Sequence, residues 1–313
     1  MAIRCPSPVF RFVKGVFYIA GPTATGKSEI ATEVARQCDG EIVSADAFQI
    51  YRGLDLLTAK PEPHLLDAVP HHLVSTIPAS EKMNAEKFRV LAIGAIRAIH
   101  ARGRRAFVVG GNGMYIKALT HGLSPLPAAN PELREQLKLL TGDELISQLA
   151  ELDPETAQTI DRNNTHRVLR ALELCLLTGE PASAQRKRAS PVAEPVGVLL
   201  CRNRAELYER INSRVETMFQ HGVVDEVRNV GKLSATALKT LGLEQIQKLI
   251  AGEISEADCI AAIQQATRRY AKRQLTWFRG QTNFEPLNLS LIRSSEAIEW
   301  IAQKARLSFA QAG

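Results

Sequence analysis

The sequence has few cysteines, and their spacing fits no common metal or disulfide framework. Five stand among the 313 residues, at Cys5, Cys38, Cys175, Cys201 and Cys259, with no CxxC spacing and no nearby histidine pairs. Structural zinc sites and disulfide-rich folds need closely spaced cysteines, so neither is expected. Unpartnered thiols are typical of a reducing compartment, and we expect a cytoplasmic protein.

Long apolar runs are missing too. No stretch approaches the roughly 18 apolar residues that cross a bilayer. The N-terminal segment 1–16 interrupts its apolar residues with Arg4, Arg11 and Lys14, whereas a signal peptide needs an unbroken apolar core. We therefore expect no membrane partner.

The net charge alone does not identify a binding partner. Lys and Arg number 39 against 33 Asp and Glu, a net charge of +6, and hydrophobic residues make up 45% of the chain. This is an ordinary globular composition for one large or two modest domains. A small positive excess suits a nucleic acid, but proteins that bind none share it.

Short apolar segments alternate with helical patterns in the first third of the chain. Val16–Ala20, Ile42–Ser44 and Ala106–Val109 are typical of buried strands. Lys27–Cys38 and Glu86–Ala101 repeat apolar residues at helical spacing. This alternation predicts an α/β fold, in which a parallel sheet is flanked by helices on both faces.

A phosphate-binding motif follows the first predicted strand. Residues 21–28, GPTATGKS, fit GxxxxGK[ST] at each fixed position and open the first predicted helix. In such a loop, backbone N–H groups and the helix N-terminus surround phosphate oxygens, and a lysine adds charge. We therefore expect Mg²⁺ on the Ser28 hydroxyl. The predicted phosphate-binding residues of the loop, for a diphosphate or a triphosphate, are Gly21, Thr23, Ala24, Thr25, Gly26, Lys27 and Ser28.

The motif predicts a P-loop NTPase-like sheet but does not decide the reaction. In a kinase or ATPase, Asp46 at the end of the second strand would organise Mg²⁺. In a second class of enzyme, the same loop would hold a diphosphate leaving group. The residues alone leave both classes open.

A change of pattern marks an insertion. Residues 125–195 show only helical patterns and loops, and Val196–Cys201 returns as an apolar strand. We expect residues 1–124 and 196–313 to form the P-loop α/β catalytic core with C-terminal helices. Residues 125–195 are expected to form an inserted all-helical domain.

Six further motifs follow in order. They are SADAFQIYRGLD at 44–55, TAKP at 58–61, PHHL at 70–73, VGGNGMY at 109–115, RVLRALE at 167–173 and AKRQLTWFR at 271–279. With the P-loop, they resemble the tRNA dimethylallyltransferase (isopentenyl-diphosphate:tRNA transferase) family, bacterial type, from about residue 16 to residue 284. Runs as long as AKRQLTWFR make a chance match implausible.

The resemblance implies a reaction and its partners. Dimethylallyl diphosphate would give its dimethylallyl group to the exocyclic amine of the adenosine 3′-adjacent to the anticodon (position 37). The acceptors would be tRNAs reading codons that begin with U, and the products N6-dimethylallyladenosine and diphosphate. The implied cofactor is Mg²⁺, the inserted domain would bind tRNA, and we expect a monomer.

The resemblance also implies roles for residues. Asp46 matches the general base, Asn112 stands beside the reacting amine, and Arg214 would clamp the diphosphate with Lys27. A carboxylate suits the first role because the amine must lose a proton as it attacks. The implied tRNA contacts are Asp46, Ala47, Phe48, Gln49, Asn112, Arg134, His166, Arg167, Val168, Leu169, Arg170, Lys239, Thr240, Leu241, Gly242, Leu243 and Glu244.

Several positions depart from the family pattern, among them Ser75-Thr76, which stands where an aspartate is typical. Ala47 replaces a common serine, Leu57 a glycine, Asn112 a threonine and Leu243 a tyrosine. These departures bear on substrate recognition more than on the class of reaction.

Three alternatives are kept beside this hypothesis. One is an adenylate dimethylallyltransferase, which prenylates free AMP, ADP or ATP; another is a P-loop kinase; the last is a non-catalytic RNA-binding relative. Among the remaining motifs, His71-His72 is interpreted as a structural turn rather than a metal site. Tyr270, Trp277 and Phe278 are interpreted as core residues, and the basic run 186–188 as a solvated loop.

Overall fold

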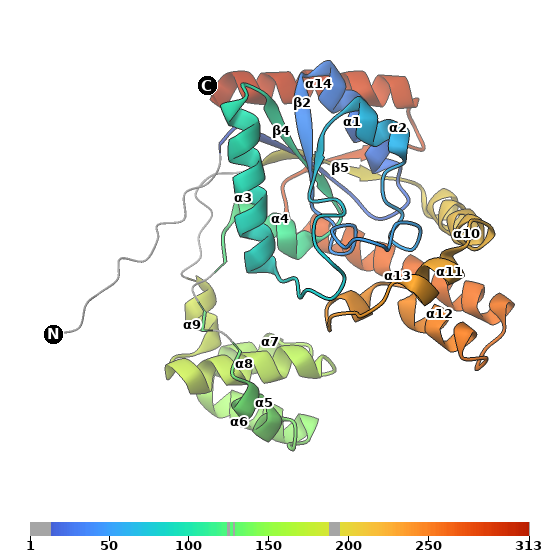
Figure 1. The fold of residues 1–313 in the computed structure, drawn as a ribbon. Coiled ribbons are helices and arrows are strands. Elements are labelled where there is room, and N and C mark those ends of the chain that lie inside the picture. The colour runs from blue at the N-terminus through green and yellow to red at the C-terminus, as the bar shows by residue number, and fades with distance from the viewer. Residues whose placement is uncertain (1–13, 124–125, 128, 188–194, 313) are drawn as a thin grey trace. The chain divides into compact units, whose positions relative to one another are not determined.

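The computed structural model describes residues 14–123, 126–127, 129–187 and 195–312 (Figure 1). The chain separates into two compact units. Met1–Thr120 with Ala193–Gly313 forms unit 1, and His121–Val192 forms unit 2. None of the described helices is both long and apolar enough to cross a membrane.

Unit 1 is built on a parallel sheet in the order β3-β2-β4-β1-β5-β6. Its strands are β1 Val16–Ala20, β2 Gly40–Ser44, β3 His71–His72, β4 Arg105–Gly110, β5 Val196–Cys201 and β6 Glu285–Asn288. In the centre, Ile19 stands opposite Val109 on one side and Val198 on the other. The α/β fold with a parallel sheet is therefore confirmed. The sequence interpretation missed β3 and β6 because these short edge strands have no apolar run.

Helices cover both faces of this sheet. Those of unit 1 are α1 Lys27–Gln37, α2 Pro63–Ala68, α3 Ala85–Ala101, α4 Gly113–Thr120, α10 Arg204–Gln220, α11 Val223–Asn229, η1 Ala237–Lys239, α12 Leu243–Ile250, α13 Glu256–Gln281 and α14 Ser294–Ala312. Successive β1 side chains point to opposite faces. Phe17 and Ile19 pack with α1 and α14, whereas Tyr18 packs in a core with residues of α3 and α13.

Unit 2 contains helices only within its described residues. They are α5 Pro131–Leu137, α6 Gly142–Leu152, α7 Pro154–Thr159, α8 Thr165–Thr178 and α9 Ala182–Lys187. Asp153 and Asn164 cap α7 and α8 through their side chains, as the Asp-Pro and Asn-Asn pairs in the sequence suggest. Leu145, Leu149 and Leu172 contribute to a hydrophobic core that belongs to this unit.

The carboxyl ends of the strands of unit 1 bring the motifs together. In a parallel sheet these ends lie along one edge, where ligands of open α/β sheets bind. The P-loop follows β1, Asp46 follows β2, Asn112 follows β4 and Arg202 follows β5. Segments far apart in the sequence therefore meet at one edge.

Candidate functional site

The P-loop has the local geometry of a phosphate-binding turn. Gly26 caps α1 with φ of 89°, a left-handed conformation in which glycine is favoured. The Thr25 hydroxyl donates to the Pro22 carbonyl at 2.9 Å, and the Lys27 ammonium donates to the same oxygen at 2.6 Å. The loop is therefore ordered around its own carbonyl groups, with the start of α1 behind it.

Three arginines contact three consecutive P-loop residues. Arg202 Nε donates to the Thr25 carbonyl and Arg210 Nε to the Ala24 carbonyl, both at 2.9 Å, while Arg214 Nη2 donates to Thr23 Oγ1 at 2.8 Å. Sequence reasoning found Arg214 alone. Arg210 stands one helical turn before Arg214 on α10, a spacing that could have suggested it, whereas nothing in the sequence pointed to Arg202.

One N–H donor of the Arg214 guanidinium makes no hydrogen bond within the described residues. Its Nε is buried and has no hydrogen-bond partner among the described residues. Burial lowers the pKa of Arg214 to about 10, and the negative charge of Asp46 acts in the opposite direction. A buried donor without a partner is costly, so an arginine kept in this state is poised for an anion.

Lys27 shares this electrostatic environment. Burial lowers its pKa to about 8, although Asp46 raises it and Arg214 lowers it further. Both cations therefore lie where their charged forms are poorly solvated. Binding of a multiply charged anion beside these two cations would offset the lost solvation of their charged forms.

Asp46 begins a tight turn after β2. Its Oδ1 accepts from the Phe48 N–H at 2.9 Å and from the Gln49 N–H at 3.3 Å. No described residue donates to Oδ2, and Asp46 lines both cavities of the site. One carboxylate oxygen is thus fixed by the backbone, and the other is available to a ligand.

Asn112 lies in the turn next to Asp46. Its backbone N–H donates to the Ala45 carbonyl at 3.2 Å, which joins the ends of β4 and β2. Its side-chain oxygen caps α4 by accepting from the Met114 and Tyr115 N–H groups at 3.1 and 3.3 Å. Among the described residues, no hydrogen bond joins Asn112 to Asp46. The carbonyl oxygen is therefore occupied, and Asn112 is not among the residues that line either cavity of the site.

Gln274 links the P-loop to the turn that carries Asn112, and sequence reasoning missed it. Its Oε1 accepts from the Thr23 N–H at 2.9 Å, and its Nε2 donates to the Gly111 carbonyl at 2.8 Å. The side chain is buried, and a Cβ at Gly111 would collide with it. The Gln274 position within AKRQLTWFR gives no sign of a contact with residues so distant in the sequence.

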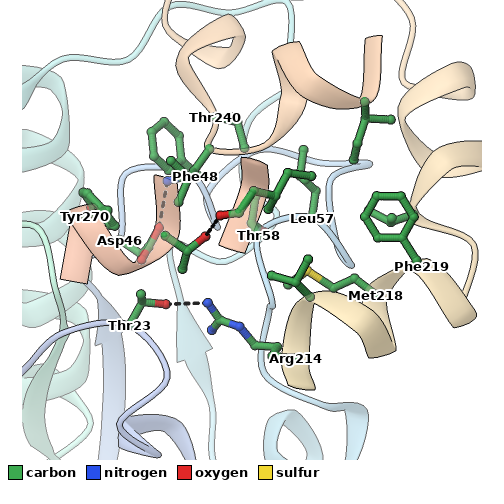
Figure 2. Close-up of a pocket in the computed structure, with 16 residues that line it drawn as sticks. Thr23, Asp46, Phe48, Leu57, Thr58, Arg214, Met218, Phe219, Thr240 and Tyr270 are labelled. Atoms are coloured by element: carbon green, nitrogen blue, oxygen red, sulfur yellow. Dashed lines mark hydrogen bonds between the residues drawn. The ribbon is translucent and has the colours of Figure 1, made fainter. Parts of the chain in front are cut away.

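Two cavities meet at these residues. The larger, of about 730 Å³, exposes P-loop residues that include Lys27 and Ser28. The smaller, of about 50 Å³, is mostly apolar and is lined by Leu57, Met218 and Phe219 among others (Figure 2). The side chains common to both linings are Thr23, Asp46, Thr58, Arg214 and Met218.

The expected tRNA contacts differ in exposure. His166, Arg167, Lys239 and Glu244 are exposed and can face a partner, whereas Ala47, Phe48, Gln49, Arg134, Arg170 and Leu241 are half-buried. Val168, Leu169 and Leu243 are buried in hydrophobic cores, and Thr240 is buried and lines the smaller cavity. Arg134 and Arg170 donate to Glu173 at 2.9 and 2.6 Å in unit 2. Gln49 donates to the Ala59 carbonyl at 3.0 Å and steadies the TAKP segment.

Some residues of the remaining motifs have structural roles. His71 and His72 form strand β3, so the expected turn is wrong, and His71 Nδ1 pairs with the Val69 carbonyl at 2.7 Å. Phe278 is fully buried and Trp277 packs edge-on against it, as expected, but Tyr270 lines the smaller cavity. The basic run 186–188 lies outside the residues whose side chains are described.

Comparisons with known proteins agree on one family. Residues 49–281 match the family described as IPP transferase. A tRNA dimethylallyltransferase of Akkermansia muciniphila is 41% identical over 281 residues, covering 90% of this chain and 96% of the relative. A tRNA dimethylallyltransferase 1 of Citrifermentans bemidjiense is 44% identical over 272 residues, covering 84% of this chain and 88% of the relative.

Solved structures give the same result. The tRNA delta(2)-isopentenylpyrophosphate transferase of Staphylococcus epidermidis has a TM-score of 0.70 at 31% identity, covering 94% of this chain and 99% of that one. A eukaryotic dimethylallyltransferase acting on tRNA shares the fold with a TM-score of 0.76 at 24% identity, covering 91% of this chain and 78% of that one.

Proposed function

We propose that this chain, which belongs to the IPP transferase family and is a tRNA dimethylallyltransferase, modifies the adenosine 3′-adjacent to the anticodon in tRNAs reading codons that begin with U. The observation that carries the assignment of the site is the buried Arg214 Nε, which lacks a partner beside the P-loop. Arg214 lines both cavities with Asp46, so an anion held there would lie next to a carboxylate.

The donor diphosphate would lie on the P-loop. The Lys27 ammonium and the start of α1 face the larger cavity, and Arg214 closes the other side through Thr23. As the bond between the allylic carbon and oxygen breaks, negative charge grows on the leaving diphosphate. Positive groups already in position stabilise that charge most effectively in a site that excludes water.

Mg²⁺ fits this arrangement through Ser28. The Ser28 hydroxyl stands at the first turn of α1 and lines the larger cavity, and Mg²⁺ favours a few protein oxygens completed by substrate phosphates. The lack of a three-residue metal cluster among the described residues agrees with a metal held mainly by substrate. When bound there, Mg²⁺ would neutralise charge on the departing diphosphate.

Asp46 would act on the tRNA adenosine that accepts the dimethylallyl group. The adenine amine attacks the allylic carbon, a carbon–nitrogen bond forms, diphosphate leaves, and the amine proton passes to Asp46 Oδ2. The fixed Oδ1 keeps the carboxylate oriented through the Phe48 and Gln49 N–H groups. Proton transfer of this kind contributes roughly 10²–10⁴-fold in rate.

The dimethylallyl tail would occupy the smaller cavity. Its walls are mostly apolar, and it shares Thr23, Asp46 and Arg214 with the diphosphate side. Burial of a hydrocarbon tail there is favourable by about 0.8 kcal/mol for each CH₂. The tail would therefore hold the reacting carbon between Arg214 and Asp46.

Residues 125–195 are proposed to form the tRNA-binding domain, with Mg²⁺ as cofactor and a monomer as the working unit. The exposed His166 and Arg167 of unit 2, and Lys239 of unit 1, can each face RNA. The groups proposed for chemistry all belong to one copy of unit 1, so catalysis needs no second chain.

The proposal is tested by nucleoside mass spectrometry. The protein is incubated with Mg²⁺, dimethylallyl diphosphate and an unmodified tRNA that reads U-initial codons, with free AMP in competition. We expect one dimethylallyl unit on the adenosine beside the anticodon and no requirement for ATP. Prenylated AMP without prenylated tRNA would instead identify an adenylate dimethylallyltransferase, and a requirement for ATP would identify a kinase.

A further inference from the structure

We infer that Leu57 limits the length of the prenyl group that the enzyme accepts. The inference rests on the proposed use of the smaller cavity for the donor tail. Leu57 lines that cavity and lies across it from the tight turn of Asp46, as Figure 2 shows. Its role would be to exclude donors longer than five carbons.

The size of the cavity matches a short chain. A volume of about 50 Å³ is roughly four times the 10–15 Å³ that a single water molecule requires by the same measure. A cavity this small leaves no room for a ten-carbon geranyl chain, which is twice as long as the dimethylallyl group. To exclude longer donors, the residues that line the smaller cavity must be unable to move out of the way.

The backbone of Leu57 is fixed by a carboxylate. Glu226 of α11 accepts from three consecutive N–H groups, those of Asp55 at 2.5 Å, Leu56 at 2.7 Å and Leu57 at 2.8 Å. Hydrogen bonds to a charged acceptor are about twice as strong as those between neutral groups. The loop that presents Leu57 is thus clamped to a helix of the same unit.

A second restraint follows directly in the sequence. The Thr58 hydroxyl donates to the Leu54 carbonyl at 2.5 Å. Lys60 donates to the Tyr51 carbonyl at 2.5 Å and forms an ion pair with Asp55. The loop is therefore held on both sides of Leu57, so a longer donor cannot displace it by shifting the backbone.

The side chain of Leu57 is confined as well. It is 7% exposed, and its Cδ1 lies 3.1 Å from where a Cβ on residue 242 would stand. Gly242 has φ of 92°, so this position favours glycine, and Leu57 packs onto its bare backbone. Gly242 therefore lies against one side of the Leu57 side chain.

Other lining residues are less suited to this role. Val215, Val223 and Ile246 come from helices, and Leu57 belongs to the same hydrophobic core. Shortening a helix residue disturbs helix packing, whereas Leu57 comes from a loop, and its truncation adds the lost volume to the cavity. Geranyl transfer needs no further reactant, because the same carbon–oxygen bond breaks and the same amine proton leaves.

The test compares two donors in Leu57→Ala and Leu57→Val. Unmodified tRNA is incubated with dimethylallyl or geranyl diphosphate, and kcat/KM is measured for each donor by nucleoside mass spectrometry. The wild-type ratio of geranyl to dimethylallyl transfer is expected below about 0.01, because each extra methylene already discriminates by 10-fold or more. Leu57→Ala should raise that ratio at least about tenfold, and Leu57→Val about threefold.

Leu54→Ala serves as the matched control. Leu54 is a fully buried leucine of the same segment, but it is not among the residues that line the cavity. The Leu54→Ala substitution should lower the melting temperature of the protein and leave the ratio of geranyl to dimethylallyl transfer unchanged. An unchanged ratio in both Leu57 variants, with dimethylallyl transfer retained, would overturn the inference alone. A wild-type protein that transfers no dimethylallyl group would overturn the proposed function as well.

Discussion

Arg134 and Arg170 of unit 2 and Arg214 of unit 1 are in opposite states. In unit 2, Arg134 and Arg170 both pair with Glu173, whose carboxylate is fully buried and also accepts from the Asn130 N–H at 2.8 Å. In unit 1, Arg214 donates to one neutral hydroxyl and leaves a buried Nε without a partner among the described residues. Arginines whose donors are paired with a carboxylate stabilise the fold, whereas a buried arginine donor without a partner is available to bind a ligand.

The family resemblance predicts functional roles for Arg134, Arg170 and Arg214 alike. Of these three, Arg214 has a buried donor without a partner among the described residues and lines a cavity. We therefore expect Arg214 to act on catalysis directly. Arg134 and Arg170 should act first on the stability of unit 2, and any contact with tRNA must be made by the N–H groups that Glu173 leaves free.

The largest effect is expected at Asp46. Asp46→Ala removes the carboxylate that would accept the amine proton, so the rate of transfer should fall by roughly 10²-fold or more. Binding of tRNA should be largely kept, because the change is confined to one side chain. Single-turnover transfer and a filter-binding assay with tRNA provide the two readings. Turnover at the wild-type rate would remove Asp46 from the mechanism.

Arg214 is expected to come next. Arg214→Ala should raise the KM for dimethylallyl diphosphate about 10- to 100-fold, because charge-assisted hydrogen bonds contribute about 1.5–3 kcal/mol. Arg204→Ala is the matched control on the same helix, since the Arg204 guanidinium lies over the Tyr208 ring and Arg204 lines neither cavity. Equal losses in the two variants would contradict the special state of Arg214.

Lys27 makes the reaction sensitive to pH. Its pKa of about 8 in the free protein lies below the ordinary lysine value of 10.5, so Lys27 loses its charge as pH rises through 8. The donor anion needs that charge, and kcat/KM reports groups of the free enzyme, so it should fall about tenfold by pH 9. Lys27→Arg stays charged and should abolish the fall. A pH profile that falls equally in Lys27→Arg would assign the titration elsewhere.

Gln274 should have a moderate effect on the rate. Gln274→Met keeps the length of the side chain but leaves the Thr23 N–H and the Gly111 carbonyl without this partner, which should lower kcat about tenfold and also lower the melting temperature. Gln264→Met is the control on the same helix, since Gln264 bonds only to residues of α10. Gln274→Glu keeps an acceptor for the Thr23 N–H and should recover part of the rate. No difference between Gln274→Met and the control would make Gln274 a packing residue.

The smallest effect on catalysis is expected in unit 2. Glu173→Gln breaks a buried ion cluster, a change that typically costs about 3–5 kcal/mol of stability. It should lower the melting temperature of unit 2 and leave kcat within about threefold, in the opposite pattern to Arg214→Ala. Calorimetry and steady-state kinetics on the same samples measure both. A large fall in kcat without loss of stability would contradict the contrast between the units.

Much of this could be predicted from the sequence because the signals are local. The P-loop is a contiguous motif, and Val16–Ala20 and Val196–Cys201 are apolar runs whose bounds match β1 and β5. The N-caps Asp153 and Asn164 are local too. Asp46 and Arg214 were identified by resemblance, and the structure adds that they line the same cavities.

The rest depends on contacts that no local pattern encodes. Gln274 meets Thr23 across 251 residues of sequence, and Glu226 meets Leu57 across 169. The edge strands β3 and β6 form because neighbouring strands offer unpaired backbone groups, not because of their own side chains. The burial of Leu243 and Thr240 likewise follows from how α12 and η1 pack, which helical periodicity alone could not tell from exposure.

The central claim is that Arg214 serves the donor and Asp46 serves the proton, and single-turnover kinetics test it most directly. The rate of dimethylallyl transfer to tRNA is measured across donor concentrations in wild type, Arg214→Ala and Asp46→Asn. Arg214→Ala should raise the donor concentration for half-maximal rate with a smaller change in the plateau. Asp46→Asn should lower the plateau with little change in that concentration. If Arg214→Ala left the donor dependence unchanged, or if Asp46→Asn kept the wild-type plateau, the assignment of the site would be wrong.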